Sequence, residues 1–507
     1  MSLPHFAKIK PNDPAIILEP KAISISFADL DRRSRRLGGF FQQRGLQRGD
    51  HIAILMGNNA YYHETCWAAQ RAGLYYTPVN WRLTLHEAAY MIEDCGAKAL
   101  IYSSELADMA HAISKKHTQP SIILRAGGKK YEEITTSSPY EQLGDRLSGA
   151  YMFYSSGTTG RPKGVKRPLP DTAFGVPDKH VERLRDRYEF DDNTVYLSPA
   201  PLYHAAPLGW TLSAQALGGA TIIMDKFDAR EFLALIEKYK VTHAQCVPTM
   251  FVRLLKLPES ERARYDLSSL KVVIHAAAPC PVDIKLKMID WFGPILQEYY
   301  AGSEGNGFVA IDSHEWLLQK GSVGKPTTCS ISIIDENGDE AQPGETGLVY
   351  FYGGAQFQYH NDEAKTKSAY DAKGRSTLGD LGYLNKEGYL YLTGRRGDMI
   401  NVGGVNVYPR EIEDVIIAHP DVCDVAVVGA PCDEYGEKIL AVIQLLDGEM
   451  HEDEFRKKLD LFCREKLAKY KIPKSILLVK DFPRMPTGKI RVDELRDIVG
   501  LPELEEK

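Results

Sequence analysis

The sequence predicts an α/β protein: a large N-terminal domain of βα-layered sheets with a β-rich subdomain, then a small α+β C-terminal domain. Short apolar runs alternate with amphipathic stretches over residues 1–150 and again over 195–300, which is typical of βαβ units on a parallel sheet. Hairpin-like strands then take over, and a compact α+β pattern ends the chain. We therefore expect two domains, residues 1–396 and 397–507.

The elements of the large domain are placed by their hydrophobic period. The first βα series has strands and helices at residues 51–56, 61–72, 85–94 and 99–102. The second series has a strand, a helix and a strand at residues 221–224, 229–239 and 271–274. The stretch 194–224 carries no charged residue, but prolines, His204 and a glycine pair interrupt it. It therefore favours a buried helix between strands over a membrane span.

The β-rich subdomain and the small domain follow the same reasoning. Hairpins are predicted around the turns 336–338 and 385–388, where Asn and Gly lie between strand-like runs. In the small domain, Pro409 opens a helix to residue 417 in the favoured first-turn position. Strands are expected at 422–428 and 439–445. One face of a second helix is marked by Phe455, Leu459, Phe462 and Leu467.

Composition narrows the classes of function. Apolar residues make up 44% and charged residues 26% of the 507 positions, as in a globular protein and unlike a disordered one. A net charge of −6 argues against a nucleic-acid partner, which needs clustered Lys and Arg. The basic stretch of Arg32, Arg33, Arg35 and Arg36 has the spacing of a solvated helix face. Eight cysteines without a CxxC pair, and a start without signal-peptide features, favour free thiols in a reducing cytoplasm.

One loop points to phosphate chemistry. A strand-like run at 151–154 leads directly into Ser155-Ser156-Gly157-Thr158-Thr159-Gly160-Arg161-Pro162-Lys163-Gly164. Glycines let the backbone approach a polyphosphate, and successive N–H groups can form an anion-binding nest. The hydroxyls and Lys163 add donors and charge, although the spacing is not that of a Walker A loop. Composition alone also allows a plain flexible turn.

The full string at 155–164 resembles the phosphate-loop signature of the adenylate-forming superfamily, which includes acyl-CoA synthetases, adenylation domains of peptide synthetases and firefly-type luciferases. Four later segments resemble further motifs of that superfamily, in the same order along the chain: residues 300–305, 378–380, 393–395 and 486–490. The resemblance covers nearly the whole chain. It implies ATP and coenzyme A as co-substrates and Mg²⁺ as a cofactor.

The resemblance implies these site residues. Lys489 is expected to be the adenylation lysine, Glu304 to help hold Mg²⁺, and Asp380 with Arg395 to hold the ribose hydroxyls. Lys163 either contacts phosphate or ends the loop in solvent. The predicted ATP- and AMP-binding set is Ser155, Ser156, Gly157, Thr158, Thr159, Gly160, Lys163, Ala276, Ala277, Glu298, Tyr299, Tyr300, Ser303, Asp380 and Arg395. Thr158, His204, Glu304 and Lys489 are the predicted catalytic residues.

The second half-reaction is expected to use other residues. Gly403 and Gly404 resemble the glycine pair past which the pantetheine arm of coenzyme A runs, although a simple strand-to-strand turn is the alternative. The small domain is expected to be mobile and to pivot at Gly397. Relatives commonly carry Asp or Lys at that position, so glycine departs from the pattern.

The acid pocket is predicted from four positions. His204 borders it in the resemblance, with a buried core histidine as the alternative reading, and Ala278, Tyr299 and Ala301 line other walls. Acetate-specific relatives carry Trp where this chain has Ala301. The small residue therefore predicts an acid larger than acetate: a medium- or long-chain fatty acid, or an aryl or alicyclic acid. Apolar walls discriminate weakly between homologous acids.

The resulting prediction is a cytoplasmic, AMP-forming acyl-CoA synthetase without a transmembrane segment, which could form homo-oligomers. Rival functions are an enzyme that loads a carrier protein, a luciferase-like oxygenase and a non-catalytic nucleotide-binding relative. The pair Gly403-Gly404 favours free coenzyme A, and the retained Lys489 argues against a pure binding protein.

Overall fold

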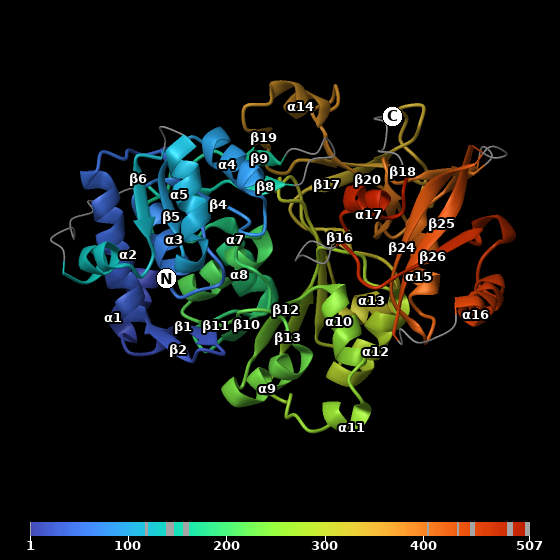
Figure 1. The fold of residues 1–507 in the computed structure, drawn as a ribbon, viewed down its shortest axis with the longest axis horizontal. Helices are drawn as coiled ribbons and strands as arrows, with labels where there is room; N and C mark the ends of the chain where they lie inside the picture. The colour runs from blue at the N-terminus through green and yellow to red at the C-terminus, as the bar shows by residue number, and fades with distance from the viewer. Residues whose placement is uncertain are drawn as a thin grey trace. The chain divides into compact units, whose positions relative to one another are not determined.

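A computed structural model describes residues 2–116, 120–137, 147–155, 162–402, 405–432, 436–446, 452–483 and 490–501 (Figure 1). The chain forms two compact units. The first unit comprises Met1–Cys246, Leu257–Val273 and Gln356–Ser368, and the second comprises Val247–Lys256, Ile274–Ala355 and Ala369–Lys507. The second unit contains residues on both sides of position 397, so the predicted domain boundary at 396/397 stays a prediction.

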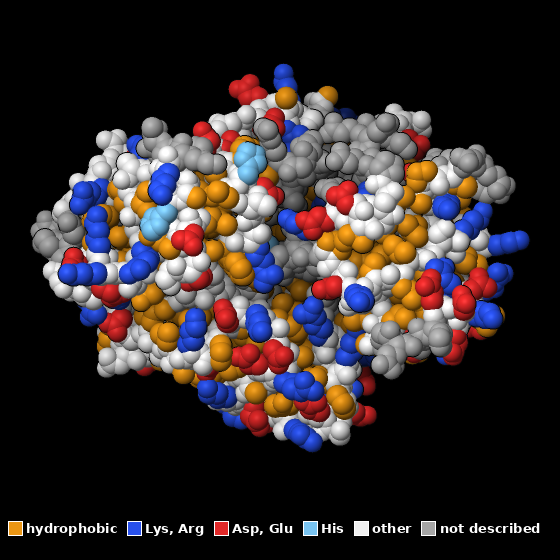
Figure 2. All heavy atoms as spheres, viewed as in Figure 1, with side chains coloured by type: hydrophobic (Ala, Val, Ile, Leu, Met, Phe, Trp, Pro, Cys, Tyr) orange, Lys and Arg blue, Asp and Glu red, His pale blue; other side chains and the backbone are white. Residues whose placement is uncertain are grey.

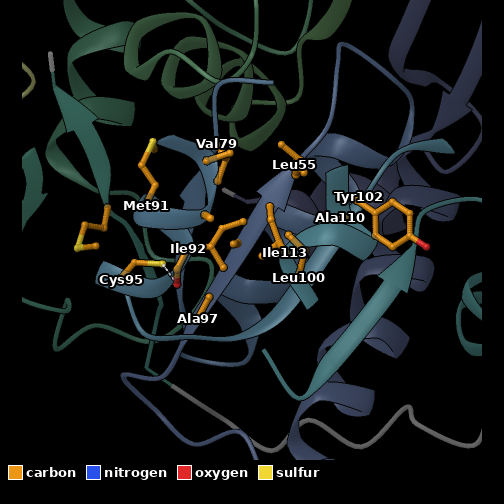
Figure 3. Packing of buried hydrophobic residues seen from close by; sticks show 14 of the residues in the cluster. Leu55, Val79, Met91, Ile92, Cys95, Ala97, Leu100, Tyr102, Ala110 and Ile113 are labelled. Atoms are coloured by element: carbon orange, nitrogen blue, oxygen red, sulfur yellow. Dashed lines mark hydrogen bonds between the residues drawn. The ribbon is translucent and has the colours of Figure 1, made fainter. Parts of the chain in front are cut away.

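The first unit contains the expected βα layers. One of its sheets has the strand order β6(Ile122–Arg125), β5(Ala97–Tyr102), β3(His51–Leu55), β4(Tyr75–Pro78) and β7(Ala150–Tyr151), with every pairing parallel. Parallel strands need helical crossovers, and α3(Tyr61–Arg71), α4(Leu85–Asp94) and α5(Ala107–Lys116) supply them. Figure 3 shows Met91 and Ile92 of α4 and Ala110 and Ile113 of α5 packed with Leu100 of β5 in one apolar core.

A second sheet segment of the first unit runs in the order β12(His243–Cys246), β10(Val195–Ser198), β11(Ala220–Met224), β1(Pro14–Glu19) and β2(Ile23–Ser26). All pairings are parallel except the terminal pair β1–β2. The remaining helices of the first unit are α1(Leu3–Ile9), α2(Phe27–Gln43), α6(Lys129–Glu132), α7(Lys179–Tyr188), α8(Ala205–Ala216), α9(Ala229–Tyr239), α11(Glu259–Arg262) and α14(Glu363–Ser368). A small antiparallel sheet, β8(Phe153–Ser155), β9(Lys163–Lys166) and β19(Gln358–Tyr359), completes the unit.

The second unit contains a short run of antiparallel strands. β14(Leu296–Tyr300) pairs with β15(Val309–Asp312), which pairs with β16(Lys325–Pro326). Next in the chain is a four-stranded antiparallel sheet, β17(Ser330–Ile334), β18(Gly347–Tyr352), β20(Ser376–Leu384) and β21(Leu390–Arg395). Val349, Phe351 and Leu390 form part of its apolar core. Helices α10(Pro248–Leu255), α12(Val282–Phe292) and α13(Ser313–Leu318) also belong to this unit.

The C-terminal part of the second unit has the predicted α+β pattern. Strands β23(Val405–Val407), β22(Ile400–Val402), β25(Gly436–Leu445) and β24(Val422–Cys432) lie in that order, and β26(Ser475–Val479) pairs with β25. The helices are α15(Pro409–Ile416), α16(Glu452–Arg464) and α17(Val492–Ile498). The core includes three of the predicted helix-face residues, Phe455, Leu459 and Leu467, together with Ile412 and Ile443.

Predicted and observed elements differ mainly at their ends. The hairpin predicted around 385–388 extends into β20 and β21, and the strands predicted at 422–428 and 439–445 are longer. The uncharged stretch forms β10, α8 and β11, as expected. Among the described residues, no helix is long and apolar enough to cross a membrane.

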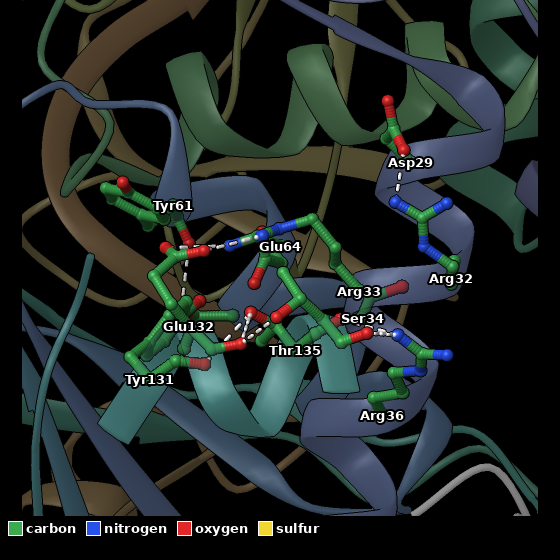
Figure 4. Close-up of polar contacts among 12 residues, drawn as sticks. Asp29, Arg32, Arg33, Ser34, Arg36, Tyr61, Glu64, Tyr131, Glu132 and Thr135 are labelled. Carbon is green, nitrogen blue, oxygen red and sulfur yellow. Dashed lines mark hydrogen bonds and ion pairs between the residues drawn. The ribbon is translucent and has the colours of Figure 1, made fainter. Parts of the chain in front are cut away.

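The prediction of a solvated arginine face is wrong for Arg33 of α2. Its Nε lies 2.6 Å from Glu64 Oε2, its Nη1 lies 2.9 Å from Glu132 Oε2, and only 14% of its side chain is exposed (Figure 4). Arg36 Nη1 donates to the Thr135 carbonyl at 3.3 Å. The cause is tertiary: α3 and the segment after α6 cover the face of α2 that its spacing leaves open. On the face that Figure 2 shows, basic and acidic side chains are intermingled.

Candidate active site

The predicted ribose-binding pair lies on one hairpin of the second unit. Asp380 on β20 and Arg395 on β21 are directly opposite each other in the antiparallel register. Arg395 Nε donates to Asp380 Oδ1 at 2.8 Å. Cross-strand neighbours have Cβ atoms about 5 Å apart, so two residues fifteen positions apart in sequence can form an ion pair here. The structure therefore brings the two predicted residues together.

A third predicted residue completes this arrangement. Tyr300, the last residue of β14, donates its hydroxyl proton to Asp380 Oδ2 at 2.5 Å. Burial, followed by the charge of Asp380, raises the pKa of the Tyr300 hydroxyl, which therefore stays a donor. The charge of Asp380 raises the pKa of Arg395. Each carboxylate oxygen accepts one bond and has capacity for another, so Asp380 can still accept two hydroxyl groups.

The turn after β14 positions Glu304. The Gly305 amide donates to the Gly302 carbonyl at 3.1 Å, and Gly305 has φ +69°. A Cβ at Gly302 would lie 2.7 Å from Glu304 Oε2 and 2.7 Å from a Leu378 methyl, so only glycine fits without displacing that carboxylate. Glu304 is 9% exposed. One carboxylate beside bound phosphates is the donor set that Mg²⁺ takes, so the metal role predicted for Glu304 is chemically consistent and stays a prediction.

No cluster of three or more His, Cys, Asp or Glu side chains that could hold a metal by themselves occurs in the described ranges.

Ser303 follows Gly302 in the same turn, and the ring of Tyr299 stacks on Phe308 with centroids 4.9 Å apart. The nucleotide role of both residues stays a prediction.

The loop after β13(Val272–His275) contains a strained residue. Ala277 has φ +76°, in the left-handed region that a residue with a Cβ rarely adopts. Such a conformation costs about 1–3 kcal/mol and is concentrated at functional sites. Ala276 beside it is 6% exposed, whereas Ala277 itself is exposed. The strain is consistent with the nucleotide role predicted for this loop.

The carboxylate of Glu298 is already engaged. Lys285 Nζ, on α12, lies 2.6 Å from Glu298 Oε2, and both side chains are buried. The sequence reasoning missed Lys285. A signal existed: Lys285 lies on the apolar side of an amphipathic helix, three residues after Val282 and three before the buried Met288. The predicted role of Glu298 in nucleotide binding stays a prediction.

The root of the predicted phosphate loop lies in the first unit. Ser155 and Lys163 are opposite each other where β8 and β9 pair. Tyr154 donates its hydroxyl proton to Asp94 Oδ2 at 2.5 Å, and the His360 amide donates to the Gly164 carbonyl at 2.7 Å. These contacts attach the hairpin to the end of α4 and to the chain segment beside β19. Sequence reasoning missed Asp94, because nothing local marks an aspartate at a helix end as a partner of a distant tyrosine.

Several predicted residues lie outside the described residues. They are Ser156, Gly157, Thr158, Thr159 and Gly160 of the phosphate loop, Gly403 and Gly404 of the coenzyme A glycine pair, and Lys489. Their roles stay predictions.

The predicted hinge and acid-pocket residues are described. Gly397 lies in the turn after β21, and in the described part of the chain a Cβ there would meet no atom within 4 Å beyond its two chain neighbours. His204 is the N-cap of α8, and its ring centroid lies 4.3 Å from that of Tyr203. His204 belongs to the first unit, whereas Ala278, Tyr299 and Ala301 belong to the second. Their joint role in an acid pocket stays a prediction.

Comparison with known proteins places the chain in a family. Residues 3–358 match the family of AMP-binding enzymes, and residues 411–489 match the AMP-binding enzyme C-terminal domain. The chain is 30% identical over 504 residues to long-chain-fatty-acid–CoA ligase FadD13 of Mycobacterium tuberculosis, covering 97% of this chain and 96% of that protein. It is 29% identical over 480 residues to a feruloyl-CoA synthase of Amycolatopsis, covering 94% of each.

A solved structure agrees with this placement. The o-succinylbenzoate CoA synthetase of Bacillus subtilis, in complex with its acyl-adenylate intermediate, superposes with a TM-score of 0.81 at 26% identity, covering 99% of each chain. The order of motifs from the phosphate loop to residue 490 is thus accompanied by the matching fold. The chain belongs to the AMP-binding enzymes of the adenylate-forming superfamily and is, at the level of that family, an AMP-forming acyl-CoA ligase.

Proposed function

We propose that this enzyme activates a carboxylic acid larger than acetate with ATP and transfers the acyl group to coenzyme A. The observation that supports the nucleotide half most strongly is the Tyr300–Asp380–Arg395 arrangement. The Asp380 carboxylate is buried and accepts one hydrogen bond from Tyr300 and one from Arg395. Each of its oxygens can accept one more hydrogen bond, which suits the two hydroxyls of a ribose.

In the first half-reaction, an oxygen of the substrate carboxylate attacks the α-phosphorus of ATP, and the bond to pyrophosphate breaks. Acyl-adenylate and pyrophosphate are the products. Two anions must approach each other, so positive charge at the reacting centre lowers the barrier. Glu304 is proposed to help hold Mg²⁺ there, and Lys489 is proposed to supply the side-chain charge.

In the second half-reaction, the thiol of coenzyme A attacks the acyl carbon, loses its proton, and AMP leaves. We propose that the residues after 396 form a mobile domain that pivots at Gly397 between the two steps. Among the described residues other than Gly397 and its two chain neighbours, no atom lies within 4 Å of a Cβ built at Gly397, which supports a pivot free of local obstruction. Gly403 and Gly404 are proposed to let the pantetheine arm pass close to the backbone.

The proposed acid is a medium- or long-chain fatty acid, or an aryl or alicyclic acid. Ala301 is the main support, because a small side chain leaves room where acetate-specific relatives carry Trp. The names of the relatives, a long-chain-fatty-acid ligase and a feruloyl-CoA synthase, are consistent with an acid of this size.

The decisive experiment measures pyrophosphate release over a panel of acids and identifies the thiol product by mass spectrometry. We expect release with acids of six or more carbons, little with acetate, and an acyl-CoA as product. If the acyl group is transferred to the thiol of an added carrier protein and not to coenzyme A, the proposed acceptor is wrong. Pyrophosphate release with acetate alone would overturn the proposed acid.

The variant Lys489→Ala separates the half-reactions. We expect adenylate formation to fall at least about a hundredfold, because one charged hydrogen bond to the transition state contributes about 1.5–3 kcal/mol and its full electrostatic effect is larger. Thioester formation from preformed acyl-adenylate should be largely retained. Equal loss in both steps would contradict the role proposed for Lys489.

A further inference from the structure

A buried charged cluster lies beside two of the predicted nucleotide-binding segments. Its members are Lys285 on α12, Glu298 on β14 and His275, the last residue of β13. Lys285 and His275 are 0% exposed and Glu298 is 6% exposed. Lys285 Nζ lies 2.6 Å from Glu298 Oε2, and His275 Nε2 lies 3.7 Å from the same oxygen. One carboxylate oxygen thus faces both side chains.

The cluster contains a single ion pair. Burial, followed by the charge of Lys285, holds the pKa of His275 well below its usual range, so its ring is neutral. The ring of Phe251 packs edge-on against His275, with centroids 5.3 Å apart. Lys285 Nζ also lies 4.5 Å from the centroid of the Trp316 ring. Within the described ranges, the ammonium group of Lys285 therefore has one anionic partner, Glu298, and faces one aromatic ring.

The position of the cluster relates it to the site. Glu298 and Tyr300 are two residues apart on β14, so their side chains lie on the same face of the strand. Tyr300 donates to Asp380 from the end of that strand. His275 directly precedes Ala276 and the strained Ala277. The cluster thus connects helix α12 to the starts of two segments predicted to hold the nucleotide.

Stability alone does not explain the pair. Taking two charges out of water has a large cost, and replacement of a buried ion pair by apolar side chains of similar volume is often neutral or stabilising. An ion pair does constrain how the two elements that carry it are placed, because its two charged atoms must lie within hydrogen-bonding distance. A shift of β14 along its axis would break the bond between Glu298 and α12.

We propose that Lys285 and Glu298 are positioning residues for ATP. Their ion pair fixes the position of β14 along its axis, so that the Tyr300 hydroxyl can donate to Asp380. Glu298 then serves the nucleotide site through its position and not through contact with ATP. The inference rests on the proposed nucleotide site, and it requires neither the proposed acid nor coenzyme A as acceptor.

Equilibrium binding of ATP with Mg²⁺ to the full-length enzyme, measured by titration calorimetry, tests this. The variants are Lys285→Met, Glu298→Gln and the double variant, each checked by thermal unfolding. Each single variant leaves one buried group without its partner, and we expect the Kd for ATP to rise about tenfold. The double variant leaves no unpaired charge, so it should unfold closer to the wild-type temperature than either single variant, but it still lacks the ion pair, and we expect its Kd for ATP to stay raised about tenfold.

The outcomes separate position from contact. If Glu298 contacts ATP, the double variant will bind as weakly as Glu298→Gln while Lys285→Met binds normally, and the proposal is overturned. An unchanged Kd in all three variants overturns it equally. Lys285→Met decides between position and contact, because it breaks the ion pair and leaves Glu298 in place; should it not fold, Lys285→Gln takes its place in the comparison. A wild type that binds ATP without thioester formation would refute the proposed function and leave this inference standing.

The first unit supplies a matched control. Arg33 and Glu64 also form an ion pair at 2.6 Å that is largely shielded from solvent, with side chains 14% and 1% exposed (Figure 4). Arg33→Met and Glu64→Gln should lower the unfolding temperature without changing the Kd for ATP. An equal rise in Kd in these controls would attribute the effect to general loss of stability and overturn the proposal.

Discussion

Two tyrosine–aspartate hydrogen bonds of the same length lie in different units of this enzyme. In the first unit Tyr154 donates to Asp94 at 2.5 Å, and in the second Tyr300 donates to Asp380 at 2.5 Å. Both tyrosines lie at or near the end of a strand, directly before a predicted nucleotide-binding loop. Burial is the main cause that raises the pKa of both hydroxyls, so both remain donors.

The partners of the two carboxylates differ. The second oxygen of Asp380 accepts from the guanidinium of Arg395 at 2.8 Å. The second oxygen of Asp94 accepts from the Asn361 side-chain amide at 3.4 Å, and the Asp94 backbone carbonyl accepts from the His360 ring at 3.0 Å and from the same amide at 3.2 Å. Asp94 is thus bound through side chain and backbone to the segment that borders the phosphate-loop hairpin. We infer that the same local pair fastens a hairpin in one unit and prepares a ligand site in the other.

The largest difference is expected between the two aspartates. Asp380→Asn removes the charge and one acceptor, so about two charge-assisted hydrogen bonds to ribose are lost or weakened. At about 1.5–3 kcal/mol each, the KM for ATP should rise about a hundredfold. Asp94→Asn should raise it less than about fivefold, because its bond acts only through the hairpin. Initial rates of pyrophosphate release at varied ATP concentration measure the KM of both variants. Equal increases in KM would contradict the different roles inferred for Asp380 and Asp94.

Two glycines allow a second comparison. A Cβ at Gly302 would lie 2.7 Å from Glu304 Oε2, whereas a Cβ at Gly164 would lie 3.1 Å from His360 Cβ and 3.2 Å from Tyr154 Cζ. Gly302→Ala should displace the Glu304 carboxylate and raise the Mg²⁺ concentration needed for half-maximal rate about tenfold, as overpacking costs about 1–3 kcal/mol.

Gly164→Ala should leave the Mg²⁺ requirement unchanged and lower the unfolding temperature by a few degrees, because its neighbours need to yield by only a few tenths of an ångström. Titration of activity with Mg²⁺ distinguishes the two variants. If Gly302→Ala has a normal Mg²⁺ requirement, Glu304 does not hold the metal.

The smallest effects are expected for the two tyrosines. Tyr300→Phe removes one of the bonds that orient Asp380, so the KM for ATP should rise about fivefold. Tyr154→Phe should change it less than about twofold and should lower the unfolding temperature more, since its bond fastens the hairpin. Thermal unfolding and ATP titration on the same samples give both quantities. A larger KM effect for Tyr154→Phe would reverse the assignment.

Local patterns were sufficient for much of the fold. The βα series from residue 51 to 102 and the helix from Pro409 follow from apolar period and turn chemistry, because those forces act between residues a few positions apart. The ends of β24 and β25 were not predicted, since strand pairing extends a strand beyond its local preference. The burial of Arg33 was missed because Glu64 and Glu132 come from other elements.

The candidate site divides in the same way. Asp380, Arg395, Tyr300 and Glu304 were predicted from motifs whose order along the chain matches the family. Asp94 and Lys285 belong to no such motif. Each was identified only by its contact with a residue on another element, Tyr154 for Asp94 and Glu298 for Lys285.

The amino-acid sequence was enough to establish the enzyme family, the motif residues and the order of the βα units, because each of these depends on short, contiguous patterns. The assignment of partners required the folded chain. Tyr300 lies 80 residues from Asp380, and Tyr154 lies 60 residues from Asp94. Hydrogen bonds and ion pairs form only within about 3 Å, and packing between distant elements brings those atoms together. The tertiary structure therefore determines that Asp94 fastens a hairpin and that Asp380 is available to a nucleotide.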